Sequence, residues 1–153
     1  QFSGIIMNYW EFNRLMLKRL MGWNIVNVAT GIALARNEDP HIKGIGTQAF
    51  GWGAINLGIV LFGRLTTQRR IEKLEDPLDP ALMADENRKL YRLLWINNRL
   101  NLLYMLFGGW LAATKGRDNA QMRGNGIGIV IQGALLFIHD TIHARKLKAK
   151  LNE

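Results

Sequence analysis

Residues 44–65 read GIGTQAFGWGAINLGIVLFGRL, and no charged side chain interrupts this stretch before Arg64. The stretch is apolar but unusually rich in glycine and alanine. In water, each glycine inside a helix would cost about 1 kcal/mol relative to alanine. In lipid, small residues are useful because they let two helices approach closely. The stretch therefore predicts a membrane-spanning helix that packs against other helices.

Part of this pattern occurs twice in the chain. Residues 22–28 read GWNIVNV and residues 51–57 read GWGAINL, so both fit G-W-x-x-[IV]-N-[VL]. The Trp and the Asn are four residues apart and share one face of a helix. Because an amide inside an apolar helix needs a partner, we expect helices held partly by buried amides. We also expect Trp52, with Gly51 and Gly58, to pack against a neighbouring helix.

Four apolar runs predict one all-α domain over residues 1–153, a four-helix integral membrane bundle. The expected spans are residues 20–36, 44–65, 93–113 and 124–143. Residues 5–20 are amphipathic and are expected to form an N-terminal helix in the membrane interface or to extend the first span. Asp79 suits an N-cap and Pro80 a first helical position. We therefore expect the second and third helices to extend into the cytoplasm on either side of a turn at residues 75–80.

Basic residues are distributed unevenly around these spans, within a net charge of +8. Fourteen flank the side that holds both termini: Arg14, Lys18, Arg19, Arg64, Arg69, Arg70, Lys73, Arg88, Lys89, Arg92, Arg145, Lys146, Lys148 and Lys150. Five flank the other side: Arg36, Lys43, Lys115, Arg117 and Arg123. This excess predicts an inner-membrane protein with both termini in the cytoplasm. Trp10, Trp95 and Trp110 are expected near the membrane interfaces.

The same charge predicts binding to the anionic inner leaflet. Nucleic acid is not an expected partner, because no aromatic residues alternate with the basic ones to stack bases.

Polar residues inside the apolar runs are the candidates for a structural polar core. They are Asn27, Asn56, Asn97, Arg99, Asn101, Gln132 and Asp140, with Asn24 and Asn98 in the same amide set. Arg99 and Asp140 lie at similar depth, roughly 10 Å inside their runs at 1.5 Å per residue. A charge at that depth usually has a partner, so we predict an Arg99–Asp140 ion pair. Alternative roles for the polar residues are an ion or proton path, or a cavity for a small polar ligand.

His139 and His143 are one helical turn apart in the sequence HDTIH. The spacing resembles H-E-x-x-H, in which two His bind zinc and the Glu activates water, but Asp140 replaces the Glu. We see no third ligand in the sequence, because His41 is expected on the opposite side of the membrane. The first interpretation is that both rings end the fourth helix and that no cofactor binds. The alternative is that they bind haem, a pigment or a metal.

Three segments resemble a family of bacterial membrane proteins with four predicted spans, a domain of unknown function. Residues 51–59 are similar to its G-W-N-x-x-N-x-x-I, and residues 97–104 to its N-x-x-L-D-x-x-Y. The third segment joins Arg123-Gly124 to QGALLF at 132–137 and to Asp140. Gly53 stands where the family favours Asn, and Asn101 stands where it favours Asp. The resemblance implies a fold and a membrane location, and no activity.

The sequence contains no cysteine and no phosphate-binding loop, nucleotide fingerprint or serine triad. We therefore expect a non-catalytic accessory or scaffold subunit that packs against other membrane protein subunits. One alternative is a cofactor-, pigment- or metal-binding membrane protein that uses His139 and His143. Further alternatives are a small transporter or membrane enzyme, or a soluble helical bundle.

Overall fold

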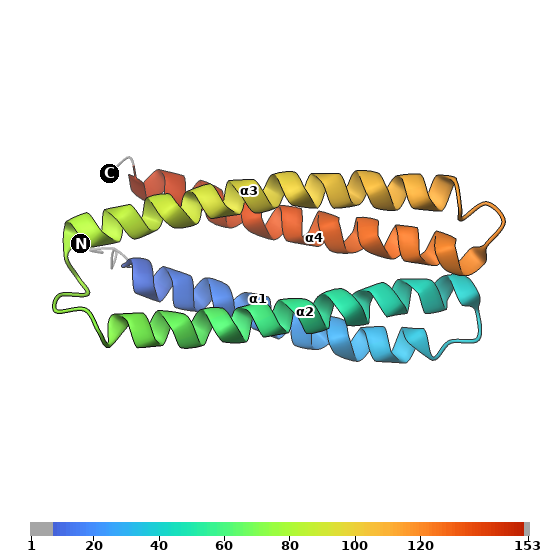
Figure 1. Cartoon of the computed structure of the whole chain (residues 1–153), viewed down its shortest axis with the longest axis horizontal. Coiled ribbons are helices and arrows are strands. Elements are labelled where there is room, and N and C mark those ends of the chain that lie inside the picture. The colour runs from blue at the N-terminus through green and yellow to red at the C-terminus, as the bar shows by residue number, and fades with distance from the viewer. Residues whose placement is uncertain (1–7, 152–153) are drawn as a thin grey trace, which may run out of the picture.

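The computed structural model describes residues 8–151 and folds them into four helices (Figure 1). These are α1 (Tyr9–Ala35), α2 (Pro40–Ile71), α3 (Pro80–Ala113) and α4 (Ala120–Leu151). Helices α1 and α2 form one antiparallel hairpin and α3 and α4 form a second, and α2 packs against α4. The start of α1 and the end of α4 lie at the same end of the bundle, called here the terminal end. The predicted all-α fold with four helices is confirmed.

Side-chain caps set where three of the helices begin. Asn8 accepts a hydrogen bond from the backbone N–H of Glu11, and Asp39 accepts from those of His41 and Ile42. Asp79 accepts from the N–H of Ala81, with Pro80 at the first helical position, as the sequence predicted. These local signals place the turns, so the chain doubles back at the points where its apolar runs end.

Of the two alternatives expected for residues 5–20, the structure shows the extension of the first span for the described residues. Tyr9–Ala35 is one continuous helix, because no Pro or cap interrupts the chain near residue 20; residues 5–7 lie outside the described part. Helix α2 ends at Ile71. The part of the bundle that extends beyond the predicted spans also contains four helices rather than two. The start of α1 and the end of α4 pack there beside the extended parts of α2 and α3.

An apolar core fills the terminal end of the bundle. It is built by Tyr9, Trp10, Phe12, Met16, Leu90, Leu94, Ala144 and Leu147, from α1, α3 and α4. Beside it, Arg70 Nη2 lies 2.6 Å from Glu86 Oε1, and the Glu86 carboxylate is almost fully buried. Burial, reinforced by that carboxylate, raises the pKa of Tyr9 to about 12. This end therefore has the apolar interior that is usual in water.

Glycine contacts hold the helices together towards the opposite end, called here the glycine end. A Cβ at Gly108 on α3 would lie 2.6 Å from the carbonyl oxygen of Gly126 on α4. A Cβ at Gly124 on α4 would collide with the carbonyl oxygen of His41 and the Cα of Gly44 on α2. At these positions the backbones approach so closely that only glycine fits.

Large apolar side chains cover the outside of the bundle from the glycine end to the edge of the apolar core. Exposed are Trp23, Ile25, Val26, Ile32, Phe50, Ile55, Ile59, Leu61, Phe62, Leu65, Leu93, Trp95, Ile96, Leu100, Leu102, Leu103, Tyr104, Leu106, Phe107, Trp110, Met122, Ile131, Ile138 and Ile142, named here the apolar belt. Among the described residues, two helices are long and apolar enough to cross a membrane: Pro40–Ile71 and Ala120–Ala149. Length and composition thus support two of the four predicted spans.

Candidate functional site

Polar side chains occupy the interior of the bundle at the level of the apolar belt. Buried there are Asn24, Asn27, Asn98, Asn101, Gln132, Asp140 and His143. Asn27 Nδ2 on α1 donates to Gln132 Oε1 on α4 at 2.6 Å, and Gln132 Nε2 donates back to Asn27 Oδ1 at 3.0 Å. Each amide satisfies both a donor and an acceptor of the other. The pair therefore joins the two hairpins through their first and last helices.

Two further polar contacts join α3 to α4. Asn98 Nδ2 donates to Thr141 Oγ1 at 2.9 Å, and Asn101 Nδ2 donates to Asp140 Oδ2 at 3.2 Å. Asn98 and Asn101 are three residues apart, so they share one face of α3. That face meets successive residues of α4 and fixes the register of the second hairpin.

The predicted Arg99–Asp140 ion pair is wrong. Arg99 is exposed, and Asp140 is bound by Asn101 instead. Residues 99 and 101 are about 200° apart around a helix, so they cannot both face α4. Asn97 is only half-buried, whereas its neighbour Asn98 is 1% exposed. The buried polar set of α3 therefore contains Asn98 and Asn101, while Arg99 lies outside it.

His139 and His143 lie close together beside this polar set. Their ring centroids are 4.2 Å apart and their planes are tilted by 38°. His139 Nδ1 lies 3.0 Å from Asp140 Oδ1, and His143 Nδ1 donates to the backbone carbonyl oxygen of His139 at 2.7 Å. The Nε2 atoms of both rings are buried without a hydrogen-bond partner among the described residues. Both rings therefore have one nitrogen held by the protein and the other unpaired.

The hydrogen bonds of the two His rings are typical of metal ligands, but the site lacks the third ligand and the well-placed acid of a zinc hydrolase. Metal-binding His residues usually donate their second ring nitrogen to a carboxylate or carbonyl, as both do here. Within residues 8–151, however, no group of three or more His, Cys, Asp or Glu side chains could hold a metal ion. Asp140 contacts Nδ1 of His139, across the ring from Nε2, so it is badly placed to activate a water bound at Nε2. The site offers two nitrogen ligands without the third ligand of zinc hydrolases.

The two copies of the Gly-Trp pattern make different contacts. Trp23 is exposed, while Asn27 four residues later belongs to the buried amide pair. Trp52 is half-buried and meets Tyr104 of α3 edge to face, with ring centroids 4.9 Å apart. The Nδ2 atom of Asn56 is buried without a hydrogen-bond partner in the described part of the chain. Trp52 thus joins α2 to α3, and Asn56 leaves an unsatisfied donor beside it.

Gly51 and Gly58 do not pack inside the bundle, and their packing against a neighbouring helix stays a prediction. A Cβ at either position would meet no other atom within 4 Å. The internal contact falls on Gly53, where a Cβ would lie 2.9 Å from a methyl group of Val28 on α1. Residues 51 and 53 lie on opposite faces of α2. The Gly51 and Gly58 side of α2 faces outward.

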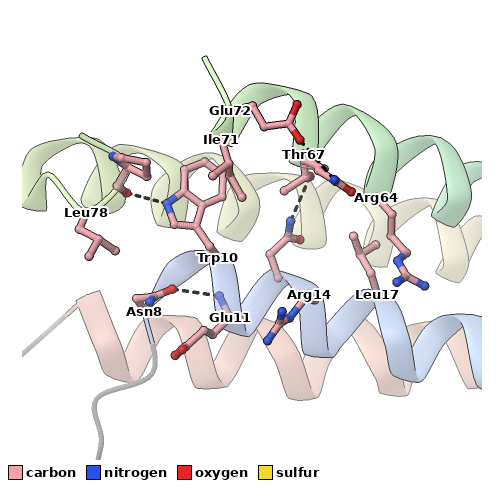
Figure 2. A pocket seen from close by; sticks show the side chains of 13 residues that line it. Asn8, Trp10, Glu11, Arg14, Leu17, Arg64, Thr67, Ile71, Glu72 and Leu78 are labelled. Carbon is pink, nitrogen blue, oxygen red and sulfur yellow. Dashed lines mark hydrogen bonds between the residues drawn. The ribbon is translucent and has the colours of Figure 1, made fainter. Parts of the chain in front are cut away.

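A groove of about 700 Å³ runs between the first half of α1 and the last half of α2 (Figure 2). Trp10 lies at one end, where its Nε1–H donates to the carbonyl oxygen of Pro77 at 2.6 Å. Trp10 is buried there, unlike Trp95 and Trp110, which are exposed, and its place near a membrane interface stays a prediction. Asn13 and Thr67 bridge the two helices across the groove, with 3.4 Å between Nδ2 and Oγ1. The groove is mixed in character, with carboxylates, amides and guanidinium groups around it.

A second hollow, of about 550 Å³, adjoins this groove and is more basic. It is lined by Glu11, Arg14, Leu15, Lys18, Met21 and Arg64, and shares Glu11, Arg14 and Arg64 with the larger groove. From the sequence, these cations are expected only as part of the side of the protein that holds most of the Lys and Arg residues. Their meeting point depends on the register of α1 against α2, which the sequence does not reveal.

The model of one protein family matches residues 19–141, which include every interior amide contact described above. The chain belongs to DUF6992, a family of unknown function. The match confirms the predicted membership of such a family, and bacterial origin and four spans stay expectations of the resemblance. The DUF6992 segment contains His139 and ends two residues before His143. Neither a curated protein nor a solved structure matches the chain.

Proposed function

We propose that this chain is a non-catalytic integral membrane protein whose four helices cross the cytoplasmic membrane and which serves as an accessory or scaffold subunit. The observation that supports membrane insertion is the inverted distribution of polarity. At the level of the apolar belt, amides such as Asn27, Asn98 and Gln132 are buried, and large apolar side chains are outside. Soluble monomers rarely expose apolar patches beyond a few hundred Å².

The low burial of the two helices that are long and apolar enough to cross a membrane supports insertion. Only 22% of the most apolar stretch of α2 and 39% of that of α4 is buried within the bundle. A core helix of similar composition would be mostly buried. The apolar side chains of α2 and α4 that are not buried within the bundle would be covered by lipid.

Helices α1 and α3 carry the amides that make them less apolar, and these amides face inward. Between membrane helices, such polar contacts contribute about 0.6–2 kcal/mol each. Asn27, Asn98 and Asn101 all have partners on α4, so α1 and α3 enter the membrane as parts of the bundle. This supports four crossings although only two helices qualify alone.

The charge distribution supports an orientation with the terminal end in the cytoplasm. Helices of roughly 40–50 Å exceed the ~30 Å hydrocarbon core of a bilayer. The surplus length lies at the terminal end, where the apolar core and most of the Lys and Arg residues are found. Excess positive charge on one side predicts that this side is cytoplasmic.

Gly51 and Gly58 support the accessory role. Both lie on the outward side of α2, where each weakens the helix by about 1 kcal/mol relative to alanine without any contact inside the bundle. Ala54, on the same side, is also exposed. A helix of another membrane subunit would approach this side closely, as small residues allow.

Single cysteines test the membrane placement directly, because the natural chain has none. We expect a membrane-impermeant maleimide to label Arg117→Cys in intact spheroplasts, Arg69→Cys only after the membrane is opened, and Ile59→Cys in neither state. Labelling of Ile59→Cys, or extraction of the chain without detergent, would show a soluble bundle and overturn the proposal.

Substitution on the outward side of α2 tests the accessory role. Under mild detergent, a companion subunit should co-purify in fixed ratio from native membranes with the natural chain and with Gly51→Ala. It should be lost with Gly58→Leu, whose melting temperature should match that of the natural chain. Co-purification that survives Gly58→Leu would place the contact elsewhere, and a chain that always purifies alone would exclude a stable complex.

The unpartnered Nε2 atoms of His139 and His143 favour one second candidate, a cofactor- or metal-binding membrane protein. Protein purified from native membranes would then carry a stoichiometric metal, haem or pigment, seen by elemental analysis and visible absorption. His139→Ala should remove it, while His41→Ala at the glycine end should not. Absence of any stoichiometric group from the natural protein would exclude this candidate.

A further inference from the structure

The basic hollow beside α1 gathers three cations around one acid. Arg14 and Lys18 are four residues apart on one side of α1, and Arg64 faces them from α2. Like charges at this spacing repel each other, so the arrangement costs stability unless an anion is present. Among residues 8–151, no carboxylate lies within ion-pair distance of any of these three side chains. The hollow therefore carries an excess of positive charge, which the Glu11 carboxylate on its lining offsets only in part.

The hollow also has an apolar part that a purely electrostatic surface would lack. Leu15 and Met21 line it together with the cations. Arg64 Nη1 lies 3.3 Å from the Met21 sulfur, which is not a charge partner. A ligand that fits must therefore present an anionic group to the cations and apolar atoms to the rest.

The position of the hollow along the bundle identifies which anion can present both groups. Met21 opens the apolar run of α1, and the exposed Trp23 follows two residues later. On α2, the exposed Phe62 and Leu65 flank Arg64 in the sequence. The hollow thus lies where the apolar belt meets the basic terminal end. A phospholipid has its phosphate at that level and its acyl chains alongside the belt.

We propose that this hollow binds the phosphate headgroup of one anionic phospholipid, held by Arg14, Lys18 and Arg64. The proposal rests on the membrane insertion proposed above. The two guanidinium groups can donate paired hydrogen bonds to phosphate oxygens, and the Lys18 ammonium adds a point charge. The site then tethers α1 to α2 through the lipid at the level where the two helices leave the membrane. It differs from general attraction to the leaflet because three named side chains on two helices meet one lipid.

Two charge-matched triple variants test the site. Arg14→Gln/Lys18→Gln/Arg64→Gln removes the cations of the hollow. Arg69→Gln/Lys73→Gln/Arg145→Gln removes the same charge from exposed positions that do not line it. Each protein is titrated with phosphatidylglycerol or phosphatidylcholine in detergent, and retained lipids are counted by native mass spectrometry. Circular dichroism and lipid-free melting temperatures check that both variants fold as the natural chain does.

The natural chain should retain one phosphatidylglycerol, and the hollow variant should bind it at least about tenfold more weakly, a loss of roughly 1.4 kcal/mol. The outer variant should bind within about twofold of the natural chain. Equal losses in the two variants would show diffuse attraction and overturn the proposal, as would equal retention of phosphatidylcholine.

A separate arm distinguishes a lipid headgroup from a free phosphate. Inorganic phosphate or glycerol phosphate, added without lipid, should neither raise the melting temperature nor displace bound phosphatidylglycerol at equal concentration. If either does so through Arg14, Lys18 and Arg64, the hollow is a site for soluble phosphate and the lipid proposal fails. The cysteine labelling described above reports membrane insertion independently, so a chain that inserts but retains no lipid would sink this inference alone.

Discussion

The two ends of the bundle are held together by opposite chemistry. At the terminal end, Leu94 and Leu147 are buried among aromatic side chains, as in a soluble protein. At the glycine end, Gly108 meets Gly126, and Gly124 meets Gly44, with backbone against backbone. The same chain therefore has an apolar core of large side chains at the terminal end and close backbone contacts in its place at the glycine end.

This difference is what two solvents along one bundle would produce. In water, burying apolar side chains contributes roughly 25 cal/mol per Å². In lipid that gain vanishes, because acyl chains are as apolar as leucine, and helix association depends on close contact and polar pairs. The exposed apolar belt surrounds the glycine contacts and the amide pairs, and it overlaps the leucine core only at its edge, where Leu93 and Trp95 are neighbours of Leu94.

The largest expected effect is at the terminal end. Leu94→Ala removes a side chain that is 3% exposed, so it should cost about 2–5 kcal/mol of unfolding free energy. Leu93→Ala is the matched control, since Leu93 is half exposed and its truncation should cost little. Denaturant titration in detergent measures both. Equal losses at the two positions would contradict an apolar core at this end.

At the glycine end, Gly124→Val should cost about 1–3 kcal/mol, because its Cβ collides with the backbone of α2 rather than with a flexible side chain. Gly58→Ala, where a Cβ meets nothing, should stabilise the isolated protein by up to ~1 kcal/mol. Thermal unfolding in detergent should show a lower melting temperature for Gly124→Val and a higher one for Gly58→Ala. If Gly124→Val were harmless, the two hairpins could not be as close as described.

Between the ends, Asn27→Leu should cost about 0.6–2 kcal/mol, since it leaves the buried amide of Gln132 without a partner. Gln132→Leu should cost a similar amount. The double variant should lose less than the sum, because neither polar group then remains unpaired. A double-mutant cycle measures this coupling. Strict additivity would mean that the two side chains do not interact.

The smallest effect at neutral pH concerns Tyr9. Its pKa of about 12 in the folded protein exceeds the ordinary value of 10.0, so Tyr9 favours folding below pH 10 and loses that contribution as the pH rises towards 12. Ultraviolet titration can follow Tyr9 alone in a Tyr91→Phe/Tyr104→Phe background, since the chain has three Tyr residues. Glu86→Gln should lower this pKa by removing a nearby negative charge. An unshifted titration would mean that the terminal end is open to water.

The sequence predicted where the helices begin and the chain turns better than it predicted which way the side chains face. The caps at Asp39 and Asp79 are local, so the apolar runs and the turns between them could be placed by counting residues. The direction in which a side chain faces is not a local property, because it depends on where the neighbouring helix lies. Arg99 is expected to pair with Asp140, but Asn101, a member of the same predicted polar set, is the residue that faces α4. Residues two positions apart, such as 99 and 101, are turned by about 200° around the helix.

The same limit hid the basic hollow. Arg14, Lys18 and Arg64 are visible as charges at the ends of apolar runs, but 46 positions separate Lys18 from Arg64 in the chain. Their meeting depends on the tilt and register of α1 against α2, which are set by contacts such as the one between Gly53 and Val28. Only a three-dimensional arrangement could bring them together.

The amide pair between α1 and α4 also imposes an order in time. Gln132 is 105 residues downstream of Asn27. At a synthesis rate of about 5–20 residues per second, the Asn27 amide would wait roughly 5–20 s for its partner to emerge. Throughout that interval the first hairpin carries an unpaired polar group in an apolar helix. The bundle is therefore finished only when its last helix arrives, and a chain truncated before α4 would leave the Asn27 amide without its Gln132 partner.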